Sequence, residues 1–203
     1  MKLKVCGMRE PLNIKALSAL TPDYMGFIFW APSSRYVETT TPELPSAIKK
    51  TGVFVDASVD YIQSMVLQHN LQAVQIHGEE TPQYCALVQD LGVEVIKAFS
   101  IKDSFDFSQL DPYETSSDFF LFDTKGELPG GNGYGFDWSL LTNYPSQKPF
   151  FLSGGIGLEH TPQIKALLNT DLPLHAIDVN SKFEIAPAIK NINALTQFKN
   201  ELY

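Results

Sequence analysis

The chain has 203 residues, of which 44% are hydrophobic, and its formal net charge is −8. This composition excludes a mainly disordered chain, and no apolar run approaches the ~20 residues that a membrane-spanning helix needs. The acidic charge argues against general nucleic-acid binding but leaves room for an anionic small ligand. Two cysteines, Cys6 and Cys85, are too few for a disulfide framework or, on their own, a zinc site. We therefore expect a soluble cytoplasmic protein that binds neither nucleic acid nor a membrane.

Short runs rich in β-forming residues recur along the whole chain. They begin near Leu3, Met25, Gly52, Ala73, Glu94, Phe119, Phe150 and His175. Most of these runs are continuously apolar rather than alternating, which is typical of strands that are buried on both faces of a parallel sheet.

Amphipathic segments lie between these runs and predict helices. Three of them are preceded by a threonine and a proline, which offer a hydroxyl N-cap and a proline in the first helical turn. These pairs are Thr41-Pro42, Thr81-Pro82 and Thr161-Pro162. Pro187 is a candidate start for the last helix, whereas Thr21-Pro22 fits a helix end. Residues 104–114 leave room only for a short or irregular helix.

Eight units of about 25 residues, each a strand followed by a helix, account for the length and approach the lower limit of a (β/α)8 barrel. The alternating order implies a parallel sheet. An open doubly wound sheet is the rival, but it usually has fewer strands, and its nucleotide-binding form has G-x-G-x-x-G after the first strand. Here Cys6-Gly7-Met8-Arg9 follows instead. We predict an α/β fold, a (β/α)8 TIM barrel, with residues 1–203 as one catalytic domain.

Barrel enzymes place their active sites at the C-terminal ends of the strands. After the seventh run, Ser153-Gly154-Gly155-Ile156-Gly157 offers bare backbone to a ligand. After the eighth, Asn180-Ser181-Lys182-Phe183-Glu184 contains S-x-x-E, a capping-box pattern that starts helices. Either loop alone could serve only a turn or a cap. Together, their unshielded N–H groups favour a phosphate site.

Cys6 ends the first run and Asp123 the sixth. A thiol there is a base or nucleophile if its pKa is lowered, or else a small buried hydrophobe. A carboxyl group that leaves an apolar run is partly desolvated, which suits a general acid, although an Asp also commonly begins a loop turn. The two form a candidate acid–base pair across the barrel mouth. Cys85, in the middle of a helical segment, is expected in the core.

Arg35 follows the second run and offers a bidentate guanidinium for a carboxylate, unless it is a surface arginine. His77 follows the fourth run and either contacts substrate or is structural. A glycine-rich segment precedes Phe136-Asp137-Trp138 and is either a lid over the site or a long connection. Its glycines are Gly130, Gly131, Gly133 and Gly135.

Taken together, these motifs resemble the phosphoribosylanthranilate isomerase family. The matching stretches run through the whole chain in the family's order. They are Lys4-Val5-Cys6-Gly7-Met8-Arg9, Ser34-Arg35-Tyr36-Val37, Gly52-Val53-Phe54-Val55, Val74-Gln75-Ile76-His77-Gly78, Phe122-Asp123, Gly130-Gly131-Asn132-Gly133 with Phe136-Asp137-Trp138, Leu152-Ser153-Gly154-Gly155-Ile156, and Asp178-Val179-Asn180-Ser181 with Glu184. The K-x-C-G-M-R start combined with the G-G-x-G…F-D-W segment is the specific part of this match.

The resemblance implies an Amadori rearrangement of N-(5-phosphoribosyl)anthranilate to 1-(2-carboxyphenylamino)-1-deoxyribulose 5-phosphate, in tryptophan biosynthesis and without a metal or redox cofactor. It assigns Asp123 to the general acid that protonates the ribose ring oxygen. It assigns Cys6 to the general base that removes the C2 proton. The expected partner is the phosphorylated small-molecule substrate, and the expected assembly is a monomer or a homodimer.

The same resemblance places substrate and phosphate contacts. Arg35 matches the arginine near the anthranilate carboxylate, and His77 and Asp178 are further substrate-binding candidates. The phosphate-binding candidates are Gly154, Gly155, Asn180 and Ser181.

The chain departs from the family's pattern in two places. Many members have Ser-Ser-Gly-Val-Glu where this chain has residues 180–184, so Lys182 replaces a glycine and either adds a charge for phosphate or points outward. The second departure is Gly-Gly-Asn-Gly-Tyr in place of Gly-Gly-Thr-Gly-Lys, with Asn132 and Tyr134 as the changed residues.

Two other readings stay open from the sequence. One is another phosphate-binding barrel enzyme, such as indole-glycerol-phosphate synthase or a sugar-phosphate aldolase, which relies on a catalytic lysine. Lys97 and Lys125 are present, but the motifs of those families do not flank them. The other is a non-catalytic barrel that only binds a phosphorylated metabolite, against which Cys6 and Asp123 argue.

Overall fold

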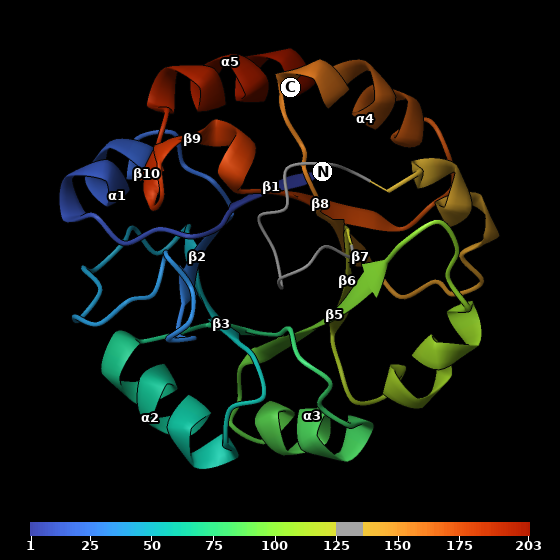
Figure 1. Ribbon diagram of the computed structural model, residues 1–203, viewed down its shortest axis with the longest axis horizontal. Coiled ribbons are helices and arrows are strands. Elements are labelled where there is room, and N and C mark those ends of the chain that lie inside the picture. The colour runs from blue at the N-terminus through green and yellow to red at the C-terminus, as the bar shows by residue number, and fades with distance from the viewer. Residues whose placement is uncertain (125–135) are drawn as a thin grey trace.

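The computed structural model describes residues 1–124 and 136–203. Its eight parallel strands form a closed barrel in chain order, and β1 pairs with β8 to complete the ring (Figure 1). The strands are β1 (Lys2–Val5), β2 (Tyr24–Ile28), β3 (Lys49–Phe54), β4 (Ala73–Ile76), β5 (Glu94–Ile101), β6 (Phe119–Thr124), β7 (Phe150–Leu152) and β8 (Leu174–Val179). The predicted (β/α)8 barrel is therefore confirmed. After β8, a two-stranded antiparallel sheet joins β9 (Glu184–Ala186) to β10 (Ile189–Lys190).

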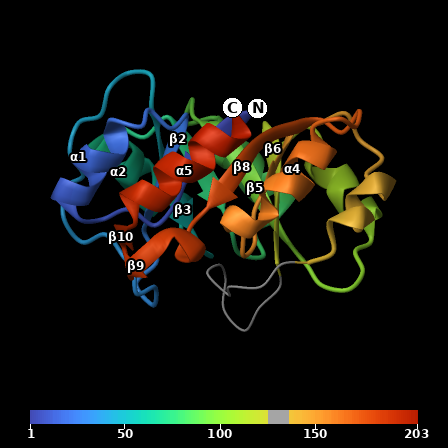
Figure 2. The same cartoon turned by 90° about the horizontal axis from the view of Figure 1, so that it is seen from above.

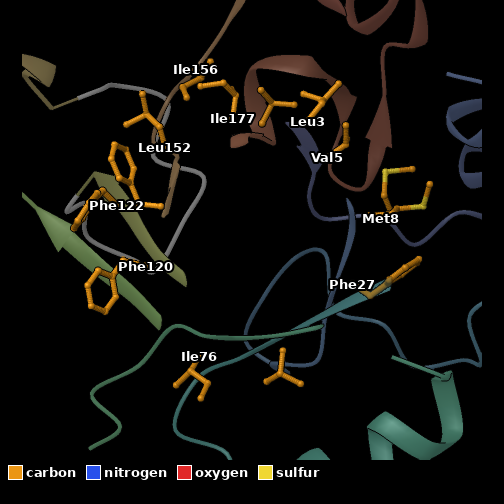
Figure 3. Packing of buried hydrophobic residues seen from close by; sticks show 14 of the residues in the cluster. Leu3, Val5, Met8, Phe27, Ile76, Phe120, Phe122, Leu152, Ile156 and Ile177 are labelled. Atoms are coloured by element: carbon orange, nitrogen blue, oxygen red, sulfur yellow. The ribbon is translucent and has the colours of Figure 1, made fainter. Parts of the chain in front are cut away.

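Apolar side chains fill both faces of the barrel wall, which explains why the strand sequences are continuously apolar. Inside the barrel, the Tyr24 and Phe151 rings meet edge-on with their centroids 5.1 Å apart. Outside, a larger layer packs between the strands and the surrounding helices. Figure 3 shows part of that layer, including Leu3, Val5, Phe27, Ile76, Phe120, Phe122 and Leu152.

Helices surround the barrel (Figure 1). They are α1 (Pro11–Ser18), α2 (Val59–His69), α3 (Pro82–Gln89), α4 (Thr161–Leu167) and α5 (Ile192–Leu202). Shorter 3-10 helices are η1 (Phe107–Tyr113), η2 (Trp138–Asn143), η3 (Leu158–His160) and η4 (Ser181–Phe183). Thr81 caps α3 as predicted, because its hydroxyl accepts a hydrogen bond from the Tyr84 N–H at 3.3 Å. The short helix expected within 104–114 is η1, and α1 ends before Thr21-Pro22 as expected.

The helix predicted to begin at Thr41-Pro42 is absent, and this prediction was wrong. The segment between β2 and β3 contains no helix. Pro45 supplies one reason, because it lacks the N–H that would close the first helical turn onto the Thr41 carbonyl. Thr41 is buried instead, and its N–H donates to His69 Nδ1 on α2 at 3.3 Å. The segment is thus held to the barrel by a tertiary contact.

Two other predicted helix starts need correction. His160 precedes α4 as its N-cap, so Thr161 is the first helical residue rather than the cap. Pro187 lies in the turn between β9 and β10, and α5 begins after Asn191, whose side chain accepts the N–H of Ala194 at 3.1 Å.

The two chain ends lie side by side on one side of the barrel, and β9 and β10 lie towards the other (Figure 2). The Tyr203 hydroxyl donates to the Met1 carbonyl at 3.0 Å, which confirms that the ends meet. In the described part of the chain, every helix falls short of the length and apolarity that a membrane span requires.

Candidate active site

A pocket opens at the C-terminal ends of the strands and encloses about 690 Å³, part of it continuous with solvent. Every residue that the sequence singled out for catalysis or binding lines this pocket. These residues are Cys6, Arg35, His77, Asp123, Gly154, Gly155, Asp178, Asn180 and Ser181. They come from β1, β2, β4, β6, β7 and β8 or the loops after them, because parallel strands in a barrel all end at one rim.

Cys6 is buried beside a lysine. Cys6 comes two residues after Lys4 in the extended chain at the end of β1, so the two side chains project to the same face of the sheet. Lys4 is fully buried, and its Nζ donates to Asp178 Oδ2 at 2.8 Å. A Cβ on Gly26 would lie 2.7 Å from the Cys6 sulfur, so the glycine leaves room for the thiol.

The ionisation of Cys6 reflects this surrounding. Burial raises the pKa of the Cys6 thiol, and the Lys4 ammonium opposes that rise. Burial would lower the pKa of Lys4, but its attraction to Asp178 and Cys6 outweighs burial and raises that pKa. The ionised thiol is therefore a strong proton acceptor, and the neighbouring Lys4 ammonium stabilises this thiolate.

Asp123 faces a histidine. Its Oδ2 lies 3.4 Å from His77 Nε2, and its Oδ1 accepts the N–H of Thr124 at 2.8 Å. The Gln75 amide nitrogen lies 2.8 Å from His77 Nδ1, so the imidazole is held between an amide and the carboxyl group. The sequence predicted His77 as a substrate contact, and the structure places it against the candidate acid as well as in the pocket.

The two loops after β7 and β8 meet in the pocket. Gly154 and Gly155 have φ angles of 96° and 66°, a region that side-chain-bearing residues rarely adopt. A Cβ on Gly154 would also overlap the Thr124 hydroxyl. Asn180 and Ser181 line the same part of the pocket from the β8 side. This backbone conformation therefore requires glycine, both glycines line the pocket, and their role in binding phosphate stays a prediction.

The capping box predicted at Ser181 is not formed. Ser181 is the first residue of η4 rather than its cap, and Asn180 makes no side-chain cap bond. Glu184, expected to close the box, accepts hydrogen bonds from Arg35 and Lys190 instead. Tertiary ion pairs have outcompeted the local capping pattern.

Arg35 is anchored at the edge of the pocket. Its Nε and Nη2 donate to Glu184 at 2.9 Å and 2.6 Å. The hydrogen bonds that Arg35 donates to Glu184 raise the pKa of Arg35. Gly7 has a φ of 74°, and a Cβ there would lie 2.7 Å from Arg35 Cδ and 2.6 Å from Asn180 Oδ1. A glycine at this position lets the loops after β1, β2 and β8 come together.

Two other polar groups at the strand ends, Lys97 and Asp56, bind the loops and are not among the residues that line the pocket. Lys97 is buried, and its Nζ donates to Glu80 at 3.0 Å and to the Gly78 carbonyl at 2.6 Å. Asp56 accepts the N–H of Glu79 at 3.0 Å. A catalytic role for Lys97, which the alternative barrel enzymes would require, is therefore not supported.

Lys4, Glu184 and Lys190 were missed as site residues by sequence reasoning. Lys4 carried one usable signal, because a charged residue inside the apolar run LKVC is expensive to bury without a partner. The glycines at 130, 131, 133 and 135, the changed residues Asn132 and Tyr134, and Lys125 lie outside the described residues. Within residues 1–124 and 136–203, His, Cys, Asp and Glu side chains form no group of three that could hold a metal ion.

Comparison with known proteins gives one consistent family. The family model described as N-(5'phosphoribosyl)anthranilate (PRA) isomerase matches residues 3–201. A relative from Parabacteroides distasonis, named N-(5'-phosphoribosyl)anthranilate isomerase, is 42% identical over 100% of this chain and 93% of its own.

Solved structures agree with this family. The phosphoribosyl anthranilate isomerase of Thermus thermophilus has a TM-score of 0.86 at 26% identity, covering 100% of this chain and 98% of its own. A second phosphoribosyl anthranilate isomerase, in complex with reduced 1-(o-carboxyphenylamino)-1-deoxyribulose 5-phosphate, has a TM-score of 0.82 at 27% identity with the same coverage.

Proposed function

The chain belongs to the N-(5'-phosphoribosyl)anthranilate isomerase family, and we propose that Cys6 and Asp123 are the base and the acid of its reaction. The reaction is the isomerisation of N-(5-phosphoribosyl)anthranilate to 1-(2-carboxyphenylamino)-1-deoxyribulose 5-phosphate in tryptophan biosynthesis. One observation carries the assignment. A thiol and a carboxyl group from opposite parts of the barrel line the same pocket as bare backbone at 154–155.

Asp123 begins the reaction by protonating the ribose ring oxygen. The C1–O bond then breaks, the ring opens, and the anilino nitrogen forms a protonated Schiff base with C1. The carboxyl group is almost fully buried, faces His77 and lines the pocket. This placement suits a general acid, whose proton must be transferred to substrate rather than exchanged with solvent.

Cys6 then removes the proton from C2. The electron pair of that C–H bond moves to neutralise the Schiff base, and the resulting enolamine tautomerises to the ketone. The reaction neither gains nor loses atoms, so one base and one acid are sufficient. Lys4 stabilises the thiolate that must form before this step, because its ammonium opposes the rise that burial causes in the pKa of Cys6.

The remaining residues hold the two anionic ends of the substrate. The N–H groups near Gly154 and Gly155, with Asn180 and Ser181, take the phosphate, and Arg35 takes the anthranilate carboxylate. Asp178 Oδ2 binds Lys4, and its Oδ1 has no hydrogen-bond partner among the described residues. We assign that oxygen to a ribose hydroxyl.

We further propose that residues 1–203 act as one catalytic domain, because every assigned residue lies at one barrel mouth. The two cysteines are free thiols, which fits a reducing cytoplasm. Light scattering on the purified protein will distinguish the two expected assemblies, a monomer and a homodimer.

The test replaces the Cys6 thiol and the Asp123 carboxyl group in separate variants. We expect Cys6→Ala and Asp123→Asn each to lower kcat by roughly 10²–10⁴-fold, the usual contribution of a general acid or base. Turnover is followed by the fluorescence of phosphoribosylanthranilate prepared in situ. Affinity for the reduced product analogue, measured by titration calorimetry, should stay within about threefold, because neither change removes an anion contact.

Matched controls are available in the same chain. Asp103→Asn changes an exposed carboxylate, and Cys85→Ala changes a thiol buried on α3, away from the pocket. Both should keep near-normal kcat. Full activity in Cys6→Ala or in Asp123→Asn would refute the assignment of that residue.

A further inference from the structure

Two side chains with no role in the proposed function connect Arg35 to Asn180, which lie close together beside Gly7. Glu184 binds Arg35, which faces the substrate carboxylate, and Lys190 binds Asn180, which faces the phosphate. Glu184 and Lys190 also bind each other, with Oε1 and Nζ 2.7 Å apart. A continuous chain of charged hydrogen bonds therefore runs from one anion contact to the other.

Glu184 leaves one edge of Arg35 free for a ligand. The Nε and Nη2 donors point to the carboxylate, which occupies one side of the guanidinium fork. A guanidinium presents five donors in a rigid plane, so the outer edge, formed by Nη1 and the second hydrogen of Nη2, remains for a second carboxylate. Arg35 lines the pocket, with its side chain 16% exposed. Glu184 thus sets the direction in which Arg35 can bind a substrate.

Lys190 binds the Glu184 carboxylate and is itself anchored to the barrel. Its side chain is fully buried, and its Nζ donates to Asn180 Oδ1 at 2.6 Å. Its backbone N–H and carbonyl both bond to the Asn13 side chain on α1, at 2.7 Å and 2.9 Å. The Ala188 N–H adds a further bond to Glu184 Oε1 at 3.1 Å. These hydrogen bonds therefore fix the pair to the barrel.

We propose that Glu184 and Lys190 are positioning residues that fix the directions in which Arg35 and Asn180 point, and so select substrates that carry both an aryl carboxylate and a phosphate. This inference rests on the proposed function, because it takes Arg35 to be the carboxylate contact. Neither residue touches substrate in this arrangement, and each acts through the residue that it holds.

Net charge and positioning predict opposite effects of Glu184→Gln on binding of the carboxylate, so this variant distinguishes between them. Arg35, Glu184 and Lys190 together carry a net charge of +1 when all three are ionised. Glu184→Gln raises that charge to +2, so simple attraction predicts tighter binding of an anionic substrate. Positioning predicts weaker recognition of the carboxylate, because Arg35 loses the partner that aims it.

The experiment compares two substrates in each variant. One is N-(5-phosphoribosyl)anthranilate, and the other is its aniline analogue, which lacks the carboxylate. The selectivity is the ratio of their kcat/KM values. In Glu184→Gln we expect this ratio to fall roughly tenfold to hundredfold, the size of one charge-assisted hydrogen-bond pair. The analogue's own kcat/KM should change by less than about threefold, and Lys190→Met should lower the ratio in the same direction.

Arg35→Met separates this inference from the proposed function. If it leaves the ratio unchanged, Arg35 is not the carboxylate contact and the proposed function fails at that residue. If Arg35→Met collapses the ratio while Glu184→Gln leaves it unchanged, only the positioning role is overturned. A proportional loss for both substrates in Glu184→Gln also overturns it, because general damage to the fold affects both equally.

Two further variants support the comparison: Glu184→Asp as an alternative to Glu184→Gln, and Ile185→Ser as a control. Glu184→Gln leaves Lys190 buried without its anion, so Glu184→Asp carries the test if the amide variant fails to fold. The shorter side chain keeps the charge but cannot reach both Arg35 donors, and the ratio should again fall, by less than in Glu184→Gln. Ile185→Ser changes the exposed neighbour on β9 and should keep the ratio of the unmodified protein. An unchanged ratio in Glu184→Asp would overturn the positioning role.

Discussion

Lys182 and Asn180 both line the described pocket and both depart from the Ser-Ser-Gly-Val-Glu pattern, and Lys182 is the departure that adds a charge. Its side chain lines the pocket, and its Nζ lies 3.8 Å from Glu159 Oε1, which is longer than a hydrogen bond. The other cation that lines the pocket, Arg35, is already bound to Glu184. Of these two cations, Lys182 therefore has the longer and weaker contact with a carboxylate, and it lies beside the loop assigned to phosphate.

We therefore expect Lys182→Gln to raise KM by roughly twofold to fivefold with kcat unchanged, the range of one partly exposed ion pair. Steady-state kinetics at low salt measure this, and the difference should shrink at high salt because salt screens exposed charges. Lys165→Gln, on the outer surface of α4, is the control. An unchanged KM would show that Lys182 only points outward.

At the scale of elements, β2 and β8 meet near the N-terminal end of the barrel through a tyrosine and a histidine. Tyr24 Oη lies 3.0 Å from His175 Nε2, and the Phe119 ring lies 4.3 Å from the imidazole. Lys2, Lys49, Glu94 and Asp23 are the charged groups around the imidazole. Burial, reinforced by Lys2, lowers the pKa of His175 to about 4. The folded protein therefore keeps this histidine neutral at neutral pH.

This shift has a definite effect on stability. The unfolded chain takes up a proton near pH 6.5 and the folded one only near pH 4, so the contribution is complete above pH 6.5 and is lost as the pH falls towards 4. The imidazole is partly exposed, and we expect a loss of about 1 kcal/mol between pH 7.5 and pH 5. Urea unfolding of the protein and of His175→Gln measures it. An equal pH dependence in both would contradict the prediction.

For the whole molecule, closure of the barrel depends on the seam between β1 and β8. Lys4 and Asp178 form a buried ion pair across that seam, although 174 residues separate them in sequence. Such a pair is costly to break from one side, because the remaining charge stays buried without a partner. The first and last strands are thus tied together by a contact that forms only when the ring is complete.

We expect Lys4→Met to lower the free energy of unfolding by about 3–5 kcal/mol, and Lys4→Met with Asp178→Leu to recover most of that loss. Lys49→Met removes a half-exposed lysine that pairs with Glu94 and should cost less than about 1 kcal/mol. Chemical denaturation monitored by circular dichroism compares the three variants. A double variant as unstable as Lys4→Met alone would show that apolar replacement cannot substitute for the pair.

Much of the fold and the pocket could be predicted from local patterns. The strands follow from apolar runs, although β3 begins at Lys49, three residues before the predicted Gly52. A barrel brings all strand ends to one rim, so Cys6 and Asp123 line one pocket. Cys85 is buried in the core on α3, as its helical surroundings predicted. The helix signal at Thr41-Pro42 failed, because Pro45 weakens the first turn and His69 offers the segment another hydrogen-bond partner.

The sequence by itself determined the order of the strands, the family and the residue types that stand at the barrel mouth, since these depend on short-range periodicity and on motifs. Only the tertiary structure decided that Glu184 binds Arg35 rather than capping η4, that Lys4 binds Asp178, and that His77 faces Asp123. Each of these contacts joins residues 46 to 174 positions apart. A buried charge must find a partner, and only the folded barrel brings one within reach.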